Sequence, residues 1–287
     1  MKRASLAVAG LLLLGLSLPL YAGEPSMTLE QLVQKHLASI GAPEARAAVK
    51  TRVAQGTSKW EVLSGGVGNV EGKATLVSEG RKVREVLRFS ANDYRGEDLI
   101  SDGEKLHVSK GLTTNLAPND PKRSLLGEFL YNEAALLREG IFTGTLGTAW
   151  PLLDAKYGSA KLSYEGVKKI DGRELHEVKF VPKKRSDADI HLYFDQDFRH
   201  VLTVATMMID PRILSGGLIQ TVRQQPIRYR LEERFEDFQM VDGLTLPTTS
   251  EVKFSAEGYA SSLMRYTTHF TNIQHNLNLD PSTFRIK

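Results

Sequence analysis

The stretch LISDGEKL, residues 99–106, has the pattern of a β-hairpin. Apolar Leu99 and Ile100 precede the polar pair Asp102-Gly103, and an apolar residue returns at Leu106. Aspartate and glycine tolerate the left-handed backbone that a tight turn requires, so the chain is expected to reverse here. The pattern therefore predicts two antiparallel strands, over residues 96–101 and 104–110.

Similar strand patterns extend from this hairpin in both directions. They predict strands over residues 48–63, 67–79 and 82–90 before it, and over residues 160–170, 173–181, 187–195, 199–209, 226–239, 245–256 and 259–273 after it. Asp171-Gly172 and Asp242-Gly243 are expected to form further hairpin turns. The fold class is therefore mainly β, with a large twisted sheet that curls around its apolar face.

Three segments have helical spacing instead. Residues 28–40 predict an amphipathic helix with Thr28 as its N-cap, residues 123–139 predict a long helix, and residues 145–155 predict a shorter one. The last two lie between the two series of strands. Because a helix cannot join the hydrogen-bond ladder of a sheet, we expect them to cover one face or the open end of the sheet as a lid.

The first 22 residues have the layout of a secretory signal peptide. Lys2 and Arg3 precede an apolar run over residues 6–20. The small residue Ala22 follows shortly after this run. We expect cleavage after Ala22, a periplasmic location and one domain over residues 23–287; the alternative is an uncleaved anchor. Removal of Lys2 and Arg3 leaves a nearly neutral chain, so nucleic acid is not an expected partner.

Several hairpin motifs, in this order, resemble those of one family. LISDGEKL at 99–106, DGRELHEV at 171–178, FEDF at 235–238 with VDGLTLP at 241–247, and NLNLD at 276–280 are similar to motifs of the LolA/LolB-like periplasmic lipoprotein carriers. The resemblance covers about residues 28–287. It implies a curved antiparallel sheet of about 11 strands forming an unclosed half-barrel, with helices covering the opening.

The resemblance also implies a function. A carrier of this kind binds acyl chains of lipoproteins or lipids in an apolar cavity and moves them toward the outer membrane, as a monomer that meets inner- and outer-membrane transport proteins. The family's lid is latched by an arginine, and Arg81 best matches its position. Lys82 follows where the family often has proline, and Arg84 and Arg88 compete for the same role.

The residues expected to line such a cavity are apolar side chains of the predicted strands and of the helix at 123–139. They are Trp60, Val62, Val83, Leu87, Phe89, Leu126, Phe129, Leu130, Leu137, Leu192, Phe194 and Met207. Each of them is equally compatible with ordinary core packing.

No pattern in the sequence indicates catalysis. There is no nucleophile elbow, phosphate-binding loop or dinucleotide-binding glycine pattern, no cysteine, and no histidine pair at metal-binding spacing. We therefore expect no catalytic residues, no metal site and no cofactor. The alternative function is a non-transporting sensor or interaction module of the cell envelope on the same fold, because fold does not fix function.

Overall fold

The computed structural model describes residues 27–114, 117–153, 160–209, 226–258 and 261–286. The expected signal peptide over residues 1–22 lies outside these ranges. Within them, no helix has the length and apolar character needed to cross a membrane.

Twelve antiparallel strands form one sheet, and two more form a small hairpin. The bounds of the twelve are β1 Thr51–Ser64, β2 Asn69–Glu79, β3 Lys82–Phe89, β4 Asp98–Ser101, β5 Leu106–Val108, β8 Lys161–Ile170, β9 Arg173–Val181, β10 Asp189–Phe194, β11 His200–Ile209, β12 Ile227–Val241, β13 Leu244–Glu257 and β14 Ser262–His275. Each lies close to its expected range, and the mainly β, unclosed architecture is confirmed. The sheet has twelve strands where about 11 were expected.

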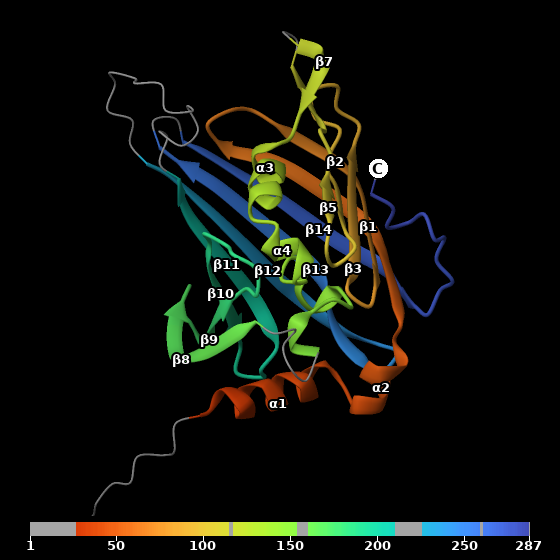
Figure 1. The fold of residues 1–287 in the computed structure, drawn as a ribbon, viewed down its shortest axis with the longest axis vertical. Helices are drawn as coiled ribbons and strands as arrows, with labels where there is room; N and C mark the ends of the chain where they lie inside the picture. Colours follow the sequence, from red (N-terminus) through yellow and green to blue (C-terminus); the bar gives the residue numbers. More distant parts are fainter. Residues whose placement is uncertain (1–26, 115–116, 154–159, 210–225, 259–260, 287) are drawn as a thin grey trace, which may run out of the picture.

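The strand order explains why the sheet needs a cover. It runs β5-β4-β3-β2-β1-β14-β13-β12-β11-β10-β9-β8, so two meanders meet where the first strand pairs with the last. The edges of the sheet are β5 and β8, and no other strand of this sheet lies between them in the sequence. The segment between them must pass from one edge to the other, and it therefore crosses the opening of the curved sheet (Figure 1).

The expected hairpin turns are present. Asp171 and Gly172 both have positive φ, 49° and 80°, and so do Asp242 and Gly243, at 48° and 79°. Positive φ at both central residues is the geometry of a type I′ turn, whose twist matches that of the flanking strands. The turn at Gly103, with φ 92°, closes the hairpin between β4 and β5.

The first expected helix is confirmed as α1, Leu29–Ile40, with Thr28 as N-cap in a capping box with Gln31. The short helix α2, Pro43–Ala48, follows it. The two helices lie across one end of the curved sheet (Figure 1), and α1 contacts β8 and β13. They close that end of the interior.

Two expectations about the segment that crosses the opening were wrong in detail. Residues 123–139 form two helices, α3 Leu125–Asn132 and α4 Ala135–Arg138, because the chain leaves helical geometry at Glu133. The described part of the range 145–155, which ends at residue 153, forms the 3₁₀ turns η1 Gly144–Leu146 and η2 Pro151–Leu153, since Gly147 and Pro151 interrupt any longer helix there. We refer to residues 124–153, from α3 to η2, as the cover.

A small hairpin was not expected from the sequence. It consists of β6 Leu112–Thr114 and β7 Ala117–Lys122, which follow β5. Its second strand reads APNDPK, and proline, asparagine and aspartate are depleted in strands, so no strand pattern was visible there.

Candidate functional site

The interior of the curved sheet is one continuous apolar cluster. It joins buried side chains of α1, of the cover and of eleven of the described strands. Ten of the twelve residues expected to line a cavity lie in it: Val83, Leu87, Phe89, Leu126, Phe129, Leu130, Leu137, Leu192, Phe194 and Met207. Trp60 packs against its margin, and Val62 is half-buried near the β1–β2 turn. In this structure these side chains pack on one another, and their role in lining a cavity stays a prediction.

On the side of β1 and β2, the cover is held by side chains that bond its backbone. The guanidinium of Arg52 is 3% exposed, and its Nη1 donates to the carbonyls of Thr145 and Leu146 at 2.7 and 2.9 Å. The Thr148 amide donates to Ser78 Oγ at 3.0 Å, and the Thr148 hydroxyl donates to the Gly80 carbonyl at 3.0 Å. These bonds fix the η1 end of the cover.

On the opposite side, the cover is tied to β12 and to the loop before β10. The Thr143 amide donates to both carboxylate oxygens of Glu233, at 3.1 and 3.2 Å. Glu139 accepts from the amide of Lys183 at 2.9 Å, and Glu133 accepts from the hydroxyl of Ser186 at 2.6 Å. The cover thus bridges the two halves of the sheet through a small number of polar contacts.

The start of α3 rests on a buried carboxyl group. Ser124 is the N-cap, and its Oγ accepts from the Gly127 amide at 2.8 Å and donates to Oε1 of Glu97. The Tyr94 hydroxyl donates to the same oxygen at 2.6 Å and lies 3.0 Å from the Tyr266 hydroxyl. The first turn of the cover therefore depends on a polar network inside an apolar core.

The turn between α4 and η1 is strained. Thr143 has φ 79°, in the left-handed region that a β-branched residue rarely adopts. Such a backbone costs on the order of 1 kcal/mol or more and persists only where its surroundings hold it. Here the Glu233 carboxylate holds the Thr143 amide, so release of that bond would relax the turn.

Three carboxyl groups face the interior from inward positions. Burial raises the pKa of Glu97 to about 7, and burial with the nearby Glu97 raises the pKa of Glu85 to about 7. Burial, together with Glu85, raises the pKa of Glu233 well above its ordinary value. Oε2 of Glu97 is buried and has no hydrogen-bond partner in the described part of the chain. Burial therefore shifts all three groups toward the protonated form relative to the same groups in water.

A buried histidine and a tryptophan attach the cover to α1. The Nε1 proton of Trp150 is donated to Nε2 of His36 at 2.9 Å, and Nδ1 of His36 lies 2.8 Å from the Phe198 carbonyl. Trp150 can only donate, so Nε2 of His36 is unprotonated and Nδ1 carries the proton. His200 stacks on the other side of Trp150, with ring centroids 4.4 Å apart. Burial lowers the pKa of His36 to about 4, and that of His200 falls too.

The predicted latch, Arg81, is exposed in the turn between β2 and β3. It lines a hollow with Arg138 of the cover, and within the described ranges no hydrogen bond or ion pair joins it to the cover. Its role as a latch stays a prediction. Arg52, which the sequence analysis did not single out, is an arginine of the sheet that does bond the cover.

One signal in the sequence could have found the missed polar groups. Arg52, Glu85 and Glu233 each occupy an inward position of an alternating strand, next to Ala54, Leu87 and Phe235 respectively. A charged residue on the apolar face of a strand is costly to bury unless it is partnered, so its presence indicates a specific contact.

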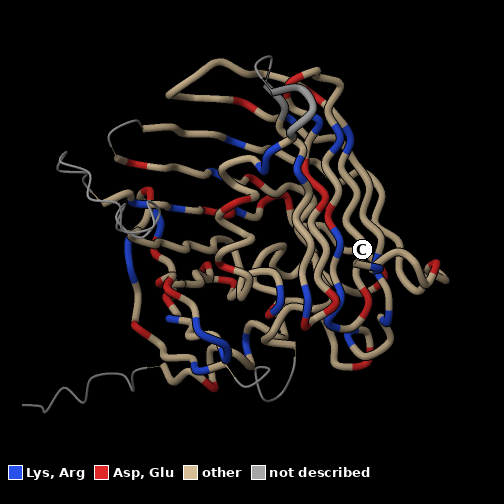
Figure 2. Tube along the Cα trace, turned by 45° about the horizontal axis from the view of Figure 1, so that its top comes forward, with Lys and Arg blue, Asp and Glu red and all other residues tan. Residues whose placement is uncertain are grey.

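Along the backbone trace, positions of basic and acidic residues alternate over the molecule (Figure 2). Across the described residues, no group of three or more histidine, aspartate or glutamate side chains is placed to hold a metal ion. The apolar interior with its cover is the site at which the sequence analysis placed its candidate residues.

The sequence matches no family model, and no curated protein matches it significantly. The fold is similar to that of a LolA superfamily protein from Nitrosomonas europaea, with 13% identity, a TM-score of 0.47, and 91% of this chain and 99% of that chain covered. It is also similar to a DUF1329 family protein from Desulfovibrio piger, with 13% identity, a TM-score of 0.48, and coverage of 90% and 97%. At such identities the likeness concerns the fold alone.

Proposed function

We propose that this protein binds acyl chains of lipoproteins or lipids in the space that the cover fills, and that it does so without catalysing a reaction. The observation that supports this most is the cover itself: a short segment with an apolar inner side, attached to the sheet by a few polar contacts. Its Leu126, Phe129, Leu130 and Leu137 belong to the same apolar cluster as the inward side chains of the sheet. An acyl chain could take their place.

Two opposing free energies determine how tightly an acyl chain binds: its own burial and the opening of the cover. Each methylene group that enters an apolar site contributes about 0.8 kcal/mol, so one acyl chain offers strong binding. Opening the cover costs the burial of its own apolar side chains and the contacts of Arg52, Glu97 and Glu233. The net affinity is the difference, and this lets a bound chain be released to an acceptor.

The remaining parts of the proposal concern the setting. We propose export by the segment 1–22, action as a monomer in the periplasm, and transport of the cargo toward the outer membrane between membrane proteins. The twelve candidate lining residues and the latch role of Arg81 belong to this proposal. Arg52 is added as a second latch, because its guanidinium bonds the cover directly.

The first test is purification from the periplasm without detergent, followed by native mass spectrometry and solvent extraction. We expect a species heavier than the chain by one or two acyl-chain ligands, which extraction removes. The proposal fails if the protein is free of ligand and also takes up no fatty acid when one is added.

Weakening the cover should tighten acyl binding. Ser124→Ala removes the N-cap of α3 and its bond to Glu97, at a cost of about 1 kcal/mol to the closed form. If binding requires opening, the affinity for a fluorescent fatty acid rises about fivefold.

Thr28→Ala is the matched control, since it removes the N-cap of α1, outside the cover. It should lower the stability by a similar amount and leave the affinity for the fatty acid unchanged. An equal change of affinity in both variants, or no change in Ser124→Ala, would count against an opening cover.

A second candidate is a sensor or interaction module of the cell envelope. It is favoured by the packing of the interior, in which the side chains of the sheet and the cover fill the cluster in this structure. This candidate predicts that the protein binds no fatty acid in the first test and that an exposed surface binds a protein partner.

A further inference from the structure

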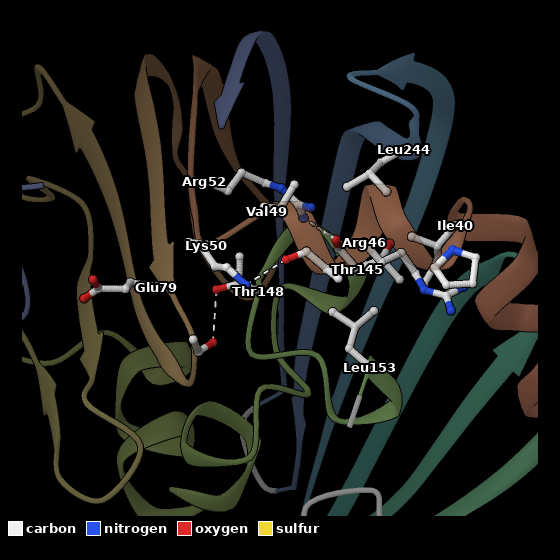
Figure 3. Close-up of a pocket in the computed structure, with 13 residues that line it drawn as sticks. Ile40, Arg46, Val49, Lys50, Arg52, Glu79, Thr145, Thr148, Leu153 and Leu244 are labelled. Atoms are coloured by element: carbon white, nitrogen blue, oxygen red, sulfur yellow. Dashed lines mark hydrogen bonds between the residues drawn. The ribbon is translucent and has the colours of Figure 1, made fainter. Parts of the chain in front are cut away.

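A cavity of about 590 Å³ lies at the end of the fold where α2 and the start of β1 meet the cover. Figure 3 shows Arg46, Lys50 and Arg52 around it, with Leu153 of the cover on another wall. None of the twelve residues proposed to contact acyl chains lines this cavity. The cavity therefore adjoins the attachment of the cover at Arg52 but lies outside the proposed acyl-binding interior.

The three cationic side chains of the cavity have no carboxylate partner. Arg52 bonds two carbonyls and, through Nε, Nε2 of His275 at 3.0 Å. Arg46 donates to backbone carbonyls of residues 37 and 41, and Lys50 donates to that of residue 47 at 2.7 Å. Among the residues that the structure describes, no ion pair involves any of the three.

Glu79, the one acidic residue among the described residues that line the cavity, is engaged elsewhere. Its carboxylate pairs with Lys82 at 2.8 Å. The cavity therefore carries an excess of positive charge around a buried guanidinium. Burial lowers the pKa of Arg52 to about 10, because it disfavours the charged form of the guanidinium. A buried charge without a partner is costly, and an anion that enters the cavity would offset that cost.

The other walls of the cavity are apolar, with Val49, Leu153 and Leu244 among the lining residues. Guanidinium groups bind phosphate and carboxylate through paired hydrogen bonds, and an ammonium group adds a point charge. An occupant should thus have an oxyanion at one end and an apolar part beside it. We propose that this cavity binds the phosphate or carboxylate head group of an anionic amphiphile.

This proposal stands apart from acyl binding in the interior, and calorimetry can test it with three probes. Inorganic phosphate, octyl phosphate and the neutral octyl glucoside are titrated separately into the purified protein at low ionic strength. We expect octyl phosphate to bind at least tenfold more tightly than octyl glucoside, and added salt to weaken it.

Octyl phosphate that binds more tightly than inorganic phosphate supports an amphiphile. Equal binding of these two supports an oxyanion site for a free anion and overturns the amphiphile. Equal binding of octyl phosphate and octyl glucoside, or no binding, overturns the proposal.

Two variants test whether octyl phosphate binds in the cavity. Lys50 is exposed at the rim, so Lys50→Gln should fold normally and lower the affinity for octyl phosphate about five- to tenfold. The control Lys161→Gln makes the same change in net charge on β8, outside the cavity lining, and should have no effect. Equal losses in both variants would show that only net charge matters and would overturn the site. Octyl glucoside should bind all three proteins alike, which separates the cavity from the apolar interior.

Discussion

Glu97→Gln is expected to gain about 3 kcal/mol of stability relative to the wild type as the pH rises from about 4.5 to about 7. Glu97 is 0% exposed, and burial raises its pKa from 4.5 to about 7, against the smaller opposing effects of Ser124 and Tyr94. Between these pH values the unfolded chain releases the proton of Glu97 and the folded protein keeps it. The unfolded state therefore binds fewer protons, and the stability of the wild type falls as the pH rises. Glutamine cannot ionise, so the variant escapes this loss.

The measurement is urea unfolding of both proteins at several pH values from 4 to 8. The quantity to compare is the difference in unfolding free energy between the variant and the wild type. The prediction concerns how this difference changes with pH. Glu128→Gln is the matched control, because it makes the same substitution on α3 at a side chain that is 52% exposed. Parallel curves for Glu97→Gln and the wild type would refute the raised pKa.

The strands could be predicted from the sequence because their signals are local. Alternation of apolar residues and the turns at Asp171-Gly172 and Asp242-Gly243 act over a few residues, and each expected strand of the large sheet was found close to its range. The pairing of β1 with β14 could not be read in this way. It joins segments more than 200 residues apart, and no local pattern specifies such a contact.

The cover shows where local reasoning fails. Its apolar spacing predicts one helix over residues 123–139, yet the chain leaves the helix at Glu133, whose carboxylate accepts from Ser186 on a distant loop. This tertiary contact competes with helix propensity, which is a weak preference over a few residues. The break lets α4 approach β4 while α3 approaches β5.

The candidate site was predictable in part for the same reason. Apolar side chains such as Phe129 and Phe194 were placed in the interior by periodicity alone. The polar contacts that hold the cover were missed, because Arg52 and Glu233 form hydrogen bonds with backbone groups about 90 residues away in the chain. Arg81 was selected through the resemblance, and the test of its role is whether its substitution alters the opening of the cover.

A second large effect on stability is expected at acidic pH. It comes from His36, whose Nε2 accepts the hydrogen bond from Nε1 of Trp150. Burial lowers the pKa of His36 from 6.5 to about 4, although its bond to the Phe198 carbonyl opposes this. Between these pH values the unfolded chain binds a proton that the folded protein excludes, so stability falls by about 3 kcal/mol as the pH falls. His36→Gln keeps an acceptor for Trp150 and removes the titration. Its stability relative to the wild type should rise by that amount from pH 6.5 to pH 4.

Nitrogen chemical shifts of His36 give an independent readout, since they should report a neutral ring with its proton on Nδ1 at pH 5. A doubly protonated ring at that pH would contradict the prediction. His200 acts in the same direction, because burial lowers its pKa too, so the His36→Gln variant should still lose stability as the pH falls, but less steeply than the wild type.

The two effects have opposite signs and overlapping windows. Glu97 removes stability as the pH rises from about 4.5 to 7, and His36 removes it as the pH falls from about 6.5 to 4. Over the shared interval their slopes cancel, so a flat curve for the wild type would not mean that these groups are unperturbed. Glu97→Gln should tilt the curve upward with pH, His36→Gln should tilt it downward, and the double variant should restore the shape of the wild-type curve. A double variant that keeps either tilt would show that the two groups, which lie under opposite ends of the cover, do not act independently.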